Sequence, residues 1–413
     1  MELGQFFMYI VLFVSLYFEV FLLVTFLEHA PMRQERAKRF KMRKPSELPT
    51  VAVIVPCFNE ETTVAGTLSS LLALTYPKGK LGIIAVNDGS TDSTLSVLQT
   101  FESNPQIRII NKENGGKHSA MNAALSVTNA EIVGCLDADS FVEPDALARI
   151  VEHFVSDPEV AAVTPSIKVH GAHNVLQVMQ KAEYGLAIFV RNAFSLLGSL
   201  FITPGPFSFF RHSVINEVGP WQHGHSTEDL EMCLRLQKNH KIVTNEPGAI
   251  VYTKTPRTFR QLFKQRVRWT YGFLKNAVDY HYMFFNPRYG TLGMLVLPMS
   301  IMSFFAAIIL FSTLIWNTLV MITWQIVRFQ TVGLSTPTAQ FDLFFIHTGV
   351  IVTVTLALII LTLVLMGIGK KLAQDSFFSF DMPIYLAVYG FITPLWLTTA
   401  VYKAVSNTSV RWR

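Results

Sequence analysis

Cysteine is scarce in this sequence. The chain has 413 residues and three cysteines, Cys57, Cys135 and Cys233, whose spacing fits neither a zinc site nor a disulfide framework. A strong excess of charge of one sign is also missing. The chain has 34 lysines and arginines and 29 acidic residues, and this small positive net charge does not indicate nucleic acid as a partner. Hydrophobic residues make up 50% of the chain. Together these features exclude a small secreted scaffold and a disordered protein.

Charge is nearly absent from four long segments. Residues 6–27, 291–327, 343–368 and 384–402 contain one charged side chain among them, that of Glu19. About 20 apolar residues cross the hydrocarbon core of a bilayer, so each segment is predicted to be transmembrane. Glu19 is then either a functional acid inside the membrane or a contact between packed helices.

The flanks of these segments indicate the orientation of the chain. Seven basic residues between Arg33 and Lys44 follow the first segment, and the positive-inside rule places them in the cytoplasm and the N-terminus outside. As one helix, the segment 291–327 would be about 55 Å long, which is too long for a single upright span. It forms either an interfacial stretch and one span or two short spans broken near Pro298. Applied to the basic residues that follow the later apolar segments, the positive-inside rule slightly favours two spans.

The region between the first two apolar segments, residues 46–256, is predicted to be an α/β domain. Short β-rich runs alternate there with amphipathic stretches such as residues 146–154, which is typical of a parallel sheet. Ligands of such sheets bind beyond the carboxyl ends of the strands, where this sequence has polar residues. The runs are 51–55, 81–86, 107–110, 132–136 and 160–163.

Two acids follow the fourth run. If Asp137 and Asp139 are on a strand, their side chains point the same way and can face one Mg²⁺ or Mn²⁺ ion. The alternative is a pair of solvated loop acids. Asp88, after the second run, is either a ligand contact or a turn residue before Gly89.

Two further charged residues, Lys117 and Asp229, are candidates for the site. Lys117 follows two glycines and can neutralise a phosphate there, although the spacing of a P-loop is absent; the alternative is an exposed loop lysine. Asp229 precedes an apolar-periodic stretch. It is either a general base at a helix start or part of a capping box in which Ser226 is the N-cap.

Residues 257–290 form an amphipathic, basic region. Gln265, Arg268 and Trp269 have the spacing i, i+3 and i+4, which places them on one face of a helix. An arginine beside an indole can pair with phosphate while the ring stacks on a sugar or a base. A helix lying on the membrane surface gives the same pattern, and both interpretations can hold at once.

Taken in order, these motifs resemble the membrane-embedded, processive family 2 glycosyltransferases, which include synthases of cellulose, chitin, hyaluronan and poly-N-acetylglucosamine. The resemblance covers residues 48–285. It is greatest to the poly-N-acetylglucosamine synthases and the Nod-factor chitin-oligosaccharide synthases. The matching motifs are VNDGST around Asp88, LDADS around Asp137, STED at 226–229 and QRVRW at 265–269.

The resemblance implies a GT-A fold and a role for each matching residue. Asp229 would be the catalytic base, and Asp137 and Asp139 would hold Mg²⁺ or Mn²⁺. Donor-binding residues would be Pro56, Asn59, Glu60, Asp88, Lys117, Asp137, Gln265, Arg268 and Trp269. Acceptor-binding residues would be Gly205, Pro206, Glu228 and Trp269.

The resemblance also implies an activity. We expect a processive, inverting β-glycosyltransferase of the plasma membrane, with a cytoplasmic catalytic domain that uses a UDP-sugar, above all UDP-N-acetylglucosamine. The partners would be this donor, a growing polysaccharide or oligosaccharide acceptor and the lipid bilayer, with room for accessory subunits. The alternatives are a non-processive transferase acting on a lipid acceptor and a synthase of hyaluronan or a glucan. A transporter or membrane scaffold whose soluble domain only binds nucleotide is disfavoured. A transporter should show intramembrane charges or repeated half-bundles, and Glu19 is the one charge within the four apolar segments.

Overall fold

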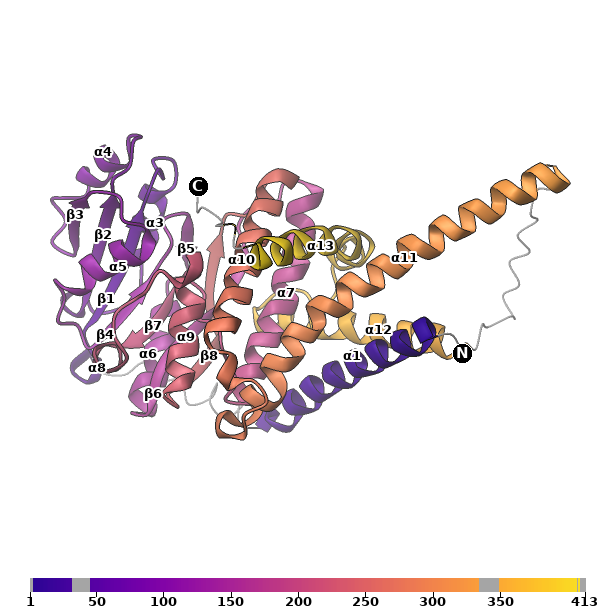
Figure 1. Cartoon of the computed structure of the whole chain (residues 1–413). Helices are drawn as coiled ribbons and strands as arrows, with labels where there is room; N and C mark the ends of the chain where they lie inside the picture. The colour runs from indigo at the N-terminus through magenta and orange to yellow at the C-terminus, as the bar shows by residue number, and fades with distance from the viewer. Residues whose placement is uncertain (1–2, 32–44, 334–348, 407, 409–413) are drawn as a thin grey trace.

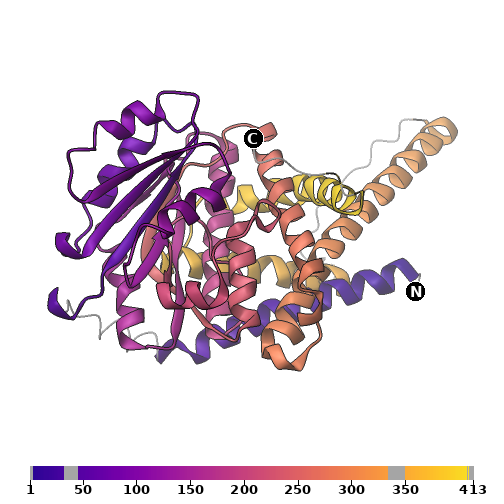
Figure 2. The same ribbon diagram turned by 60° about the vertical axis from the view of Figure 1, so that its left-hand side comes forward.

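The computed structural model describes residues 3–31, 45–333, 349–406 and 408. The basic residues between Arg33 and Lys44 and the beginning of the segment 343–368 lie outside the described residues. Within them, an α/β domain forms one half of the molecule, and the apolar helices extend from it toward one side (Figure 1). Figure 2 shows the same division after a turn about the vertical axis.

Eight strands form one mixed sheet in the order β3-β2-β1-β4-β7-β6-β8-β5. The first four are parallel, whereas β7 is antiparallel to both of its neighbours and β5 is antiparallel to β8. The five predicted runs form β1–β4 and β6, and all of them point in the same direction, as predicted. The sheet is mixed because of β5 and β7, two short strands that the sequence did not indicate. The strands are β1 Val51–Cys57, β2 Leu81–Asp88, β3 Ile107–Lys112, β4 Ile132–Cys135, β5 Ser140–Val142, β6 Val160–Val169, β7 Ser208–Arg211 and β8 Ile242–Thr253.

Helices cover both faces of the sheet. Side chains alternate between the faces along β1, so that Val53 belongs to a core with residues of α3 and α6, and Ile54 to a second core with residues of α5, α7 and α9. Burial on both faces explains why β1 reads as a continuous apolar run. The helices of this domain are α3 Val64–Leu72, α4 Thr94–Gln99, α5 Lys117–Leu125, α6 Ala146–Ser156, α7 Val175–Leu196, α8 His212–Val218, α9 Glu228–Lys238 and α10 Phe259–Asp279.

In the part of the chain that the structure describes, four helices are long and apolar enough to cross a membrane. They coincide with the four apolar segments of the sequence. The segment 291–327 forms one unbroken helix after a short π-helical stretch, and Pro298 lies in its first turn, where a proline is tolerated. The alternative of two short spans broken at Pro298 is therefore wrong. The helices are α1 Leu3–Glu28, α11 Leu297–Val332, α12 Val350–Leu372 and α13 Asp381–Val405.

The helix α7 lies between the sheet and the apolar helices. It packs on β6 and β8 and also on α1, α12 and α13. Its contact with α12 is close: a side chain at Gly369 would collide with the backbone carbonyl of Gly185, so the two helices meet at their main chains. The sequence patterns did not predict this helix, whose 22 residues connect the two halves of the molecule.

Polar contacts also connect the apolar helices to the rest of the chain. After α12, the Asp375 carboxylate lies 3.7 Å from the ammonium of Lys168 on β6 and 3.6 Å from that of Lys181 on α7. Within the helices, the Thr362 hydroxyl of α12 donates a 2.9 Å hydrogen bond to Glu19 of α1. Of the two interpretations of Glu19, the structure shows the contact between packed helices.

Candidate active site

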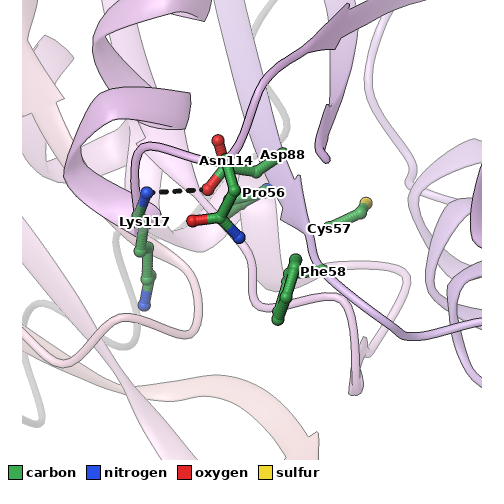
Figure 3. A pocket seen from close by; sticks show the side chains of 7 residues that line it. Pro56, Cys57, Phe58, Asp88, Asn114 and Lys117 are labelled. Carbon is green, nitrogen blue, oxygen red and sulfur yellow. Dashed lines mark hydrogen bonds between the residues drawn. The ribbon is translucent and has the colours of Figure 1, made fainter. Parts of the chain in front are cut away.

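A cavity of about 340 Å³ opens at the carboxyl ends of β1 and β2. Figure 3 shows its lining from close by. The loops after these strands bring together residues that the sequence motifs had selected, as expected for an α/β sheet. The lining residues are Pro56, Cys57, Phe58, Asp88, Asn114, Gly116 and Lys117.

Asp88 shapes the loop that precedes α5. Its carboxylate accepts hydrogen bonds from the backbone N–H groups of Gly115 at 3.0 Å and Gly116 at 2.9 Å, and from the Lys112 ammonium at 2.7 Å. Figure 3 shows the side chain facing this loop. A carboxylate has about four acceptor sites, so these three hydrogen bonds use most of them. Asp88 ends β2 and organises the loop around the cavity. Its role is therefore larger than that of a turn residue before Gly89.

Asn59 and Glu60 connect the loop after β1 to the loop after β2. The side-chain oxygen of Asn59 accepts a 2.8 Å hydrogen bond from the N–H of Thr91, and the N–H of Glu60 donates to the hydroxyl of Thr94, also at 2.8 Å. The backbone of Asn59 is left-handed, with φ 55°, a conformation that asparagine tolerates better than most residues. These contacts hold the rim of the cavity.

Lys117 is the central charge of the site. Its ammonium lies 2.6 Å from Asp137 and 3.2 Å from Glu228, and its side chain is 11% exposed. Burial alone would lower the pKa of Lys117, but the charges of Asp137 and Glu228 outweigh burial and hold this pKa well above its ordinary value. The alternative of an exposed loop lysine is wrong. Gly205, in the loop before β7, lies against Lys117 and Asp137.

Asp137 and Asp139 lie in the turn between β4 and β5 and not on a strand, so the prediction from strand periodicity is wrong. They are nevertheless close: burial and then the charges of Asp137 and Glu60 raise the pKa of Asp139 to about 6. The donors are all carboxylate oxygens, which suits Mg²⁺ or Mn²⁺. Among the described residues no group of three ligating side chains is found, so the two acids would leave other positions of an ion to substrate oxygens or water.

Asp229 lies beside this cluster, at the beginning of α9. Burial, followed by the charge of Glu228, raises the pKa of Asp229 to about 6, while the Lys117 ammonium opposes this shift. The neighbouring Glu228 behaves in the opposite way, because Lys117 overcomes the effect of burial and lowers the pKa of Glu228. Two adjacent carboxyl groups are thus held in different protonation ranges.

The capping-box interpretation of this segment is wrong. The N-cap of α9 is Thr227, whose side chain makes no capping hydrogen bond. Before it, three successive residues have left-handed backbones: Gly224 with φ 51°, His225 with φ 53° and Ser226 with φ 67°. Such conformations are unfavourable for His225 and Ser226 and need support from their surroundings.

The support comes from α10. The side-chain N–H₂ group of Asn276, which is 1% exposed, donates to the carbonyl of Gly224 and the hydroxyl of Thr227, both at 3.0 Å. His225 pairs with Asp279 at 2.7 Å. One turn before Asn276, Gly272 touches Thr227 so closely that a side chain there would collide with it. The helix with the QRVRW motif therefore also holds the loop that precedes Asp229.

Comparison with known proteins agrees with this geometry. Residues 49–272 match the family described as glycosyltransferase like family 2. The chain belongs to this family. It is 34% identical over 224 residues to poly-beta-1,6-N-acetyl-D-glucosamine synthase of Staphylococcus epidermidis, and 33% identical over 228 residues to the synthase of the same name from Staphylococcus aureus strain COL. These alignments cover 54% and 55% of both chains, so the chain spans about half the length of the curated relatives it matches.

A solved structure confirms the predicted GT-A fold. The mannosyltransferase PcManGT from Pyrobaculum calidifontis, in complex with GDP-Man and Mn²⁺, has a TM-score of 0.56 over 95% of this chain and 99% of its own. The two sequences are 19% identical, so the likeness supports the fold and not the substrate. The family match ends within α10, which places α11–α13 outside it.

The QRVRW residues of this family 2 member lie on α10, whose first turn has a capping box between Thr258 and Gln261. Trp269 is 39% exposed, and the charge of Arg268 helps to lower the pKa of Glu228, which places Arg268 near the site. Pro206 lies in the loop that leads into β7. The sequence motifs assigned no role to Asn276 or Gly272. The one signal in the sequence for their contact with the loop before Asp229 is an isolated glycine within a helical pattern.

Proposed function

We propose that this protein is a processive, inverting β-glycosyltransferase that polymerises sugar from UDP-N-acetylglucosamine and passes the product through the membrane. The observation that supports this most is the cluster of Lys117, Asp137, Glu228 and Asp229 beside the cavity, because it combines a cation for a diphosphate with a carboxylate whose pKa is near neutrality. The names of the staphylococcal relatives support the choice of sugar.

The proposed reaction is a single displacement. Asp229 takes the proton of the acceptor hydroxyl as that oxygen bonds to the anomeric carbon of the donor, and the bond from this carbon to the diphosphate breaks. Lys117 neutralises part of the charge on the departing UDP. A divalent cation held by Asp137 and Asp139 would supply further positive charge to the diphosphate, in keeping with the Mn²⁺ that accompanies GDP-Man in the PcManGT complex. Attack from the opposite side converts an α-linked donor into a β-linkage.

The donor site of this proposal includes Asp88 and the rim residues Asn59 and Glu60. Gly205 and Pro206 would border the acceptor, and Trp269 would carry its sugar ring. The catalytic domain would face the cytoplasm of a plasma membrane, in keeping with the basic residues that follow α1. The four apolar helices support contact with a bilayer.

The test is transfer by the full chain in lipid nanodiscs, with radiolabelled UDP-N-acetylglucosamine, UDP-glucose, UDP-glucuronic acid and GDP-mannose in separate reactions and Mn²⁺ present. A long product from the first donor, digested by a glycosidase specific for β-1,6-linked N-acetylglucosamine, supports the proposal. One sugar on a lipid would favour the non-processive alternative, and a polymer from another donor would favour a synthase of that polymer. Asp229→Asn is the matched inactive control.

A further inference from the structure

Arg266 lies inside the QRVRW motif, directly after Gln265. It is 4% exposed, whereas Trp269, three residues later on the same helix, is 39% exposed. The guanidinium of Arg266 stacks over the indole of Trp269, with its central carbon 4.3 Å from the ring centroid. It also donates a 3.0 Å hydrogen bond to the side-chain oxygen of Gln265. One buried cation therefore contacts two of the residues assigned to substrates.

The guanidinium is fixed from the opposite side. Glu183 of α7 lies 2.6 Å from it in an ion pair, and the other oxygen of Glu183 accepts a 2.7 Å hydrogen bond from the hydroxyl of Tyr389 on α13. The Glu183 and Tyr389 side chains thus connect α7 and α13 to Arg266. Charge-assisted contacts of this kind are stronger than neutral hydrogen bonds, and the planar guanidinium makes them directional.

We propose that Arg266 is a positioning residue that holds the ring of Trp269 at the acceptor site and connects it to α13 through Glu183 and Tyr389. Arg266 covers one face of the indole and leaves the remaining exposed surface to the acceptor sugar. Because it is buried, it acts through Trp269 and does not touch the substrate. Product length should therefore depend on it more than the transfer step does. This inference rests on the proposed function for its consequence but not for its geometry.

The first test needs no turnover. Acrylamide quenching of tryptophan fluorescence is measured on the full chain in nanodiscs, and the signal of Trp269 is the difference from Trp269→Phe. Arg266→Lys keeps the charge but loses the planar stack, so the quenching constant of Trp269 should rise by about twofold. Arg260→Lys, an exposed arginine on the same helix, is the matched control and should leave it unchanged. An unchanged Trp269 signal in Arg266→Lys would overturn the proposal.

The second test uses the product. In Arg266→Lys the mean product length should fall by a larger factor than the rate of UDP release, whereas a residue needed only for folding would lower both together. Tyr389→Phe removes one hydroxyl and should change both readouts in the same direction by a smaller factor. If Arg266→Lys does not fold, Tyr389→Phe takes its place as the test. Unchanged product length and UDP release in Tyr389→Phe would then contradict the proposal. If the wild-type chain makes no polymer, the proposed function fails, and the quenching result still decides the role of Arg266.

Discussion

Lowering the pH from 7 to 5 should remove most of the transfer activity, because Asp229, the proposed base, must be ionised to accept a proton. The pKa of Asp229 is raised to about 6. With that value about 90% of the carboxyl groups are ionised at pH 7 and about 10% at pH 5, so kcat should fall roughly tenfold between these pH values. A carboxyl group with the ordinary value of 3.8 would remain ionised over the whole range.

The charge of Glu228 predicts the direction in which the pH profile should move when this residue is changed. The negative charge of Glu228 is the second cause of the raised pKa of Asp229, after burial. In Glu228→Gln that charge is removed, so the ionised form of Asp229 becomes more favourable and its pKa falls. The acidic limb of the kcat profile should then move to lower pH, by less than the whole difference between 6 and 3.8, since burial remains.

The assay is initial UDP release at saturating donor from pH 4.5 to 8, in nanodiscs, for the wild type and Glu228→Gln. The pKa of Asp139 is also raised to about 6, so the profile is repeated at two Mn²⁺ concentrations. Protons and Mn²⁺ compete for Asp139, and a limb caused by that residue would move with Mn²⁺, whereas a limb caused by Asp229 would not. The assignment of the limb to Asp229 is wrong if the limb follows Mn²⁺, or if Glu228→Gln leaves it in place or moves it to higher pH.

Three further predictions concern other parts of the molecule. EDTA should stop transfer, and Asp139→Asn should raise the Mn²⁺ concentration needed for half-maximal rate; transfer that persists in EDTA contradicts the metal assignment. Gly272→Ala should lower kcat by about tenfold or more despite the better helix propensity of alanine, because the new methyl group collides with Thr227, whereas Gly390→Ala, in open space on α13, should keep full activity. Asp381→Asn removes the partner of a buried lysine on α12, 2.6 Å away, and should cost about 3–5 kcal/mol of stability, measured as a lower midpoint of thermal unfolding in detergent.

The sequence was informative where a local pattern decides the structure. Val51–Val55 could be recognised as a strand because both of its faces are buried, and the four apolar helices because lipid demands an uninterrupted apolar run. The strand β7 has four residues, and β8 contains Pro247 and Gly248, so neither shows a clear period. These strands depend on pairing with neighbours that are distant in the chain.

The candidate site could be predicted in part for the same reason. Lys117 and Asp229 belong to short motifs and could be singled out, but their meeting depends on loops from separate strands. Asp137 and Asp139 were chosen by a strand periodicity that does not apply to the turn in which they lie. Arg266 was passed over because its partner Glu183 is 83 residues away, and no local spacing reports such a contact.

The close packing of α7 on α12 has a consequence for movement. Gly185 and Gly369 meet at their backbones, and the turn after α12 is held by Asp375 to Lys168 and Lys181 on the domain side. A rocking of the catalytic domain against the apolar helices would have to separate these contacts together. Turning a side chain such as that of Trp269 disturbs none of them. In the proposed synthase, the step that advances the polymer by one sugar should therefore be sought in parts smaller than a domain.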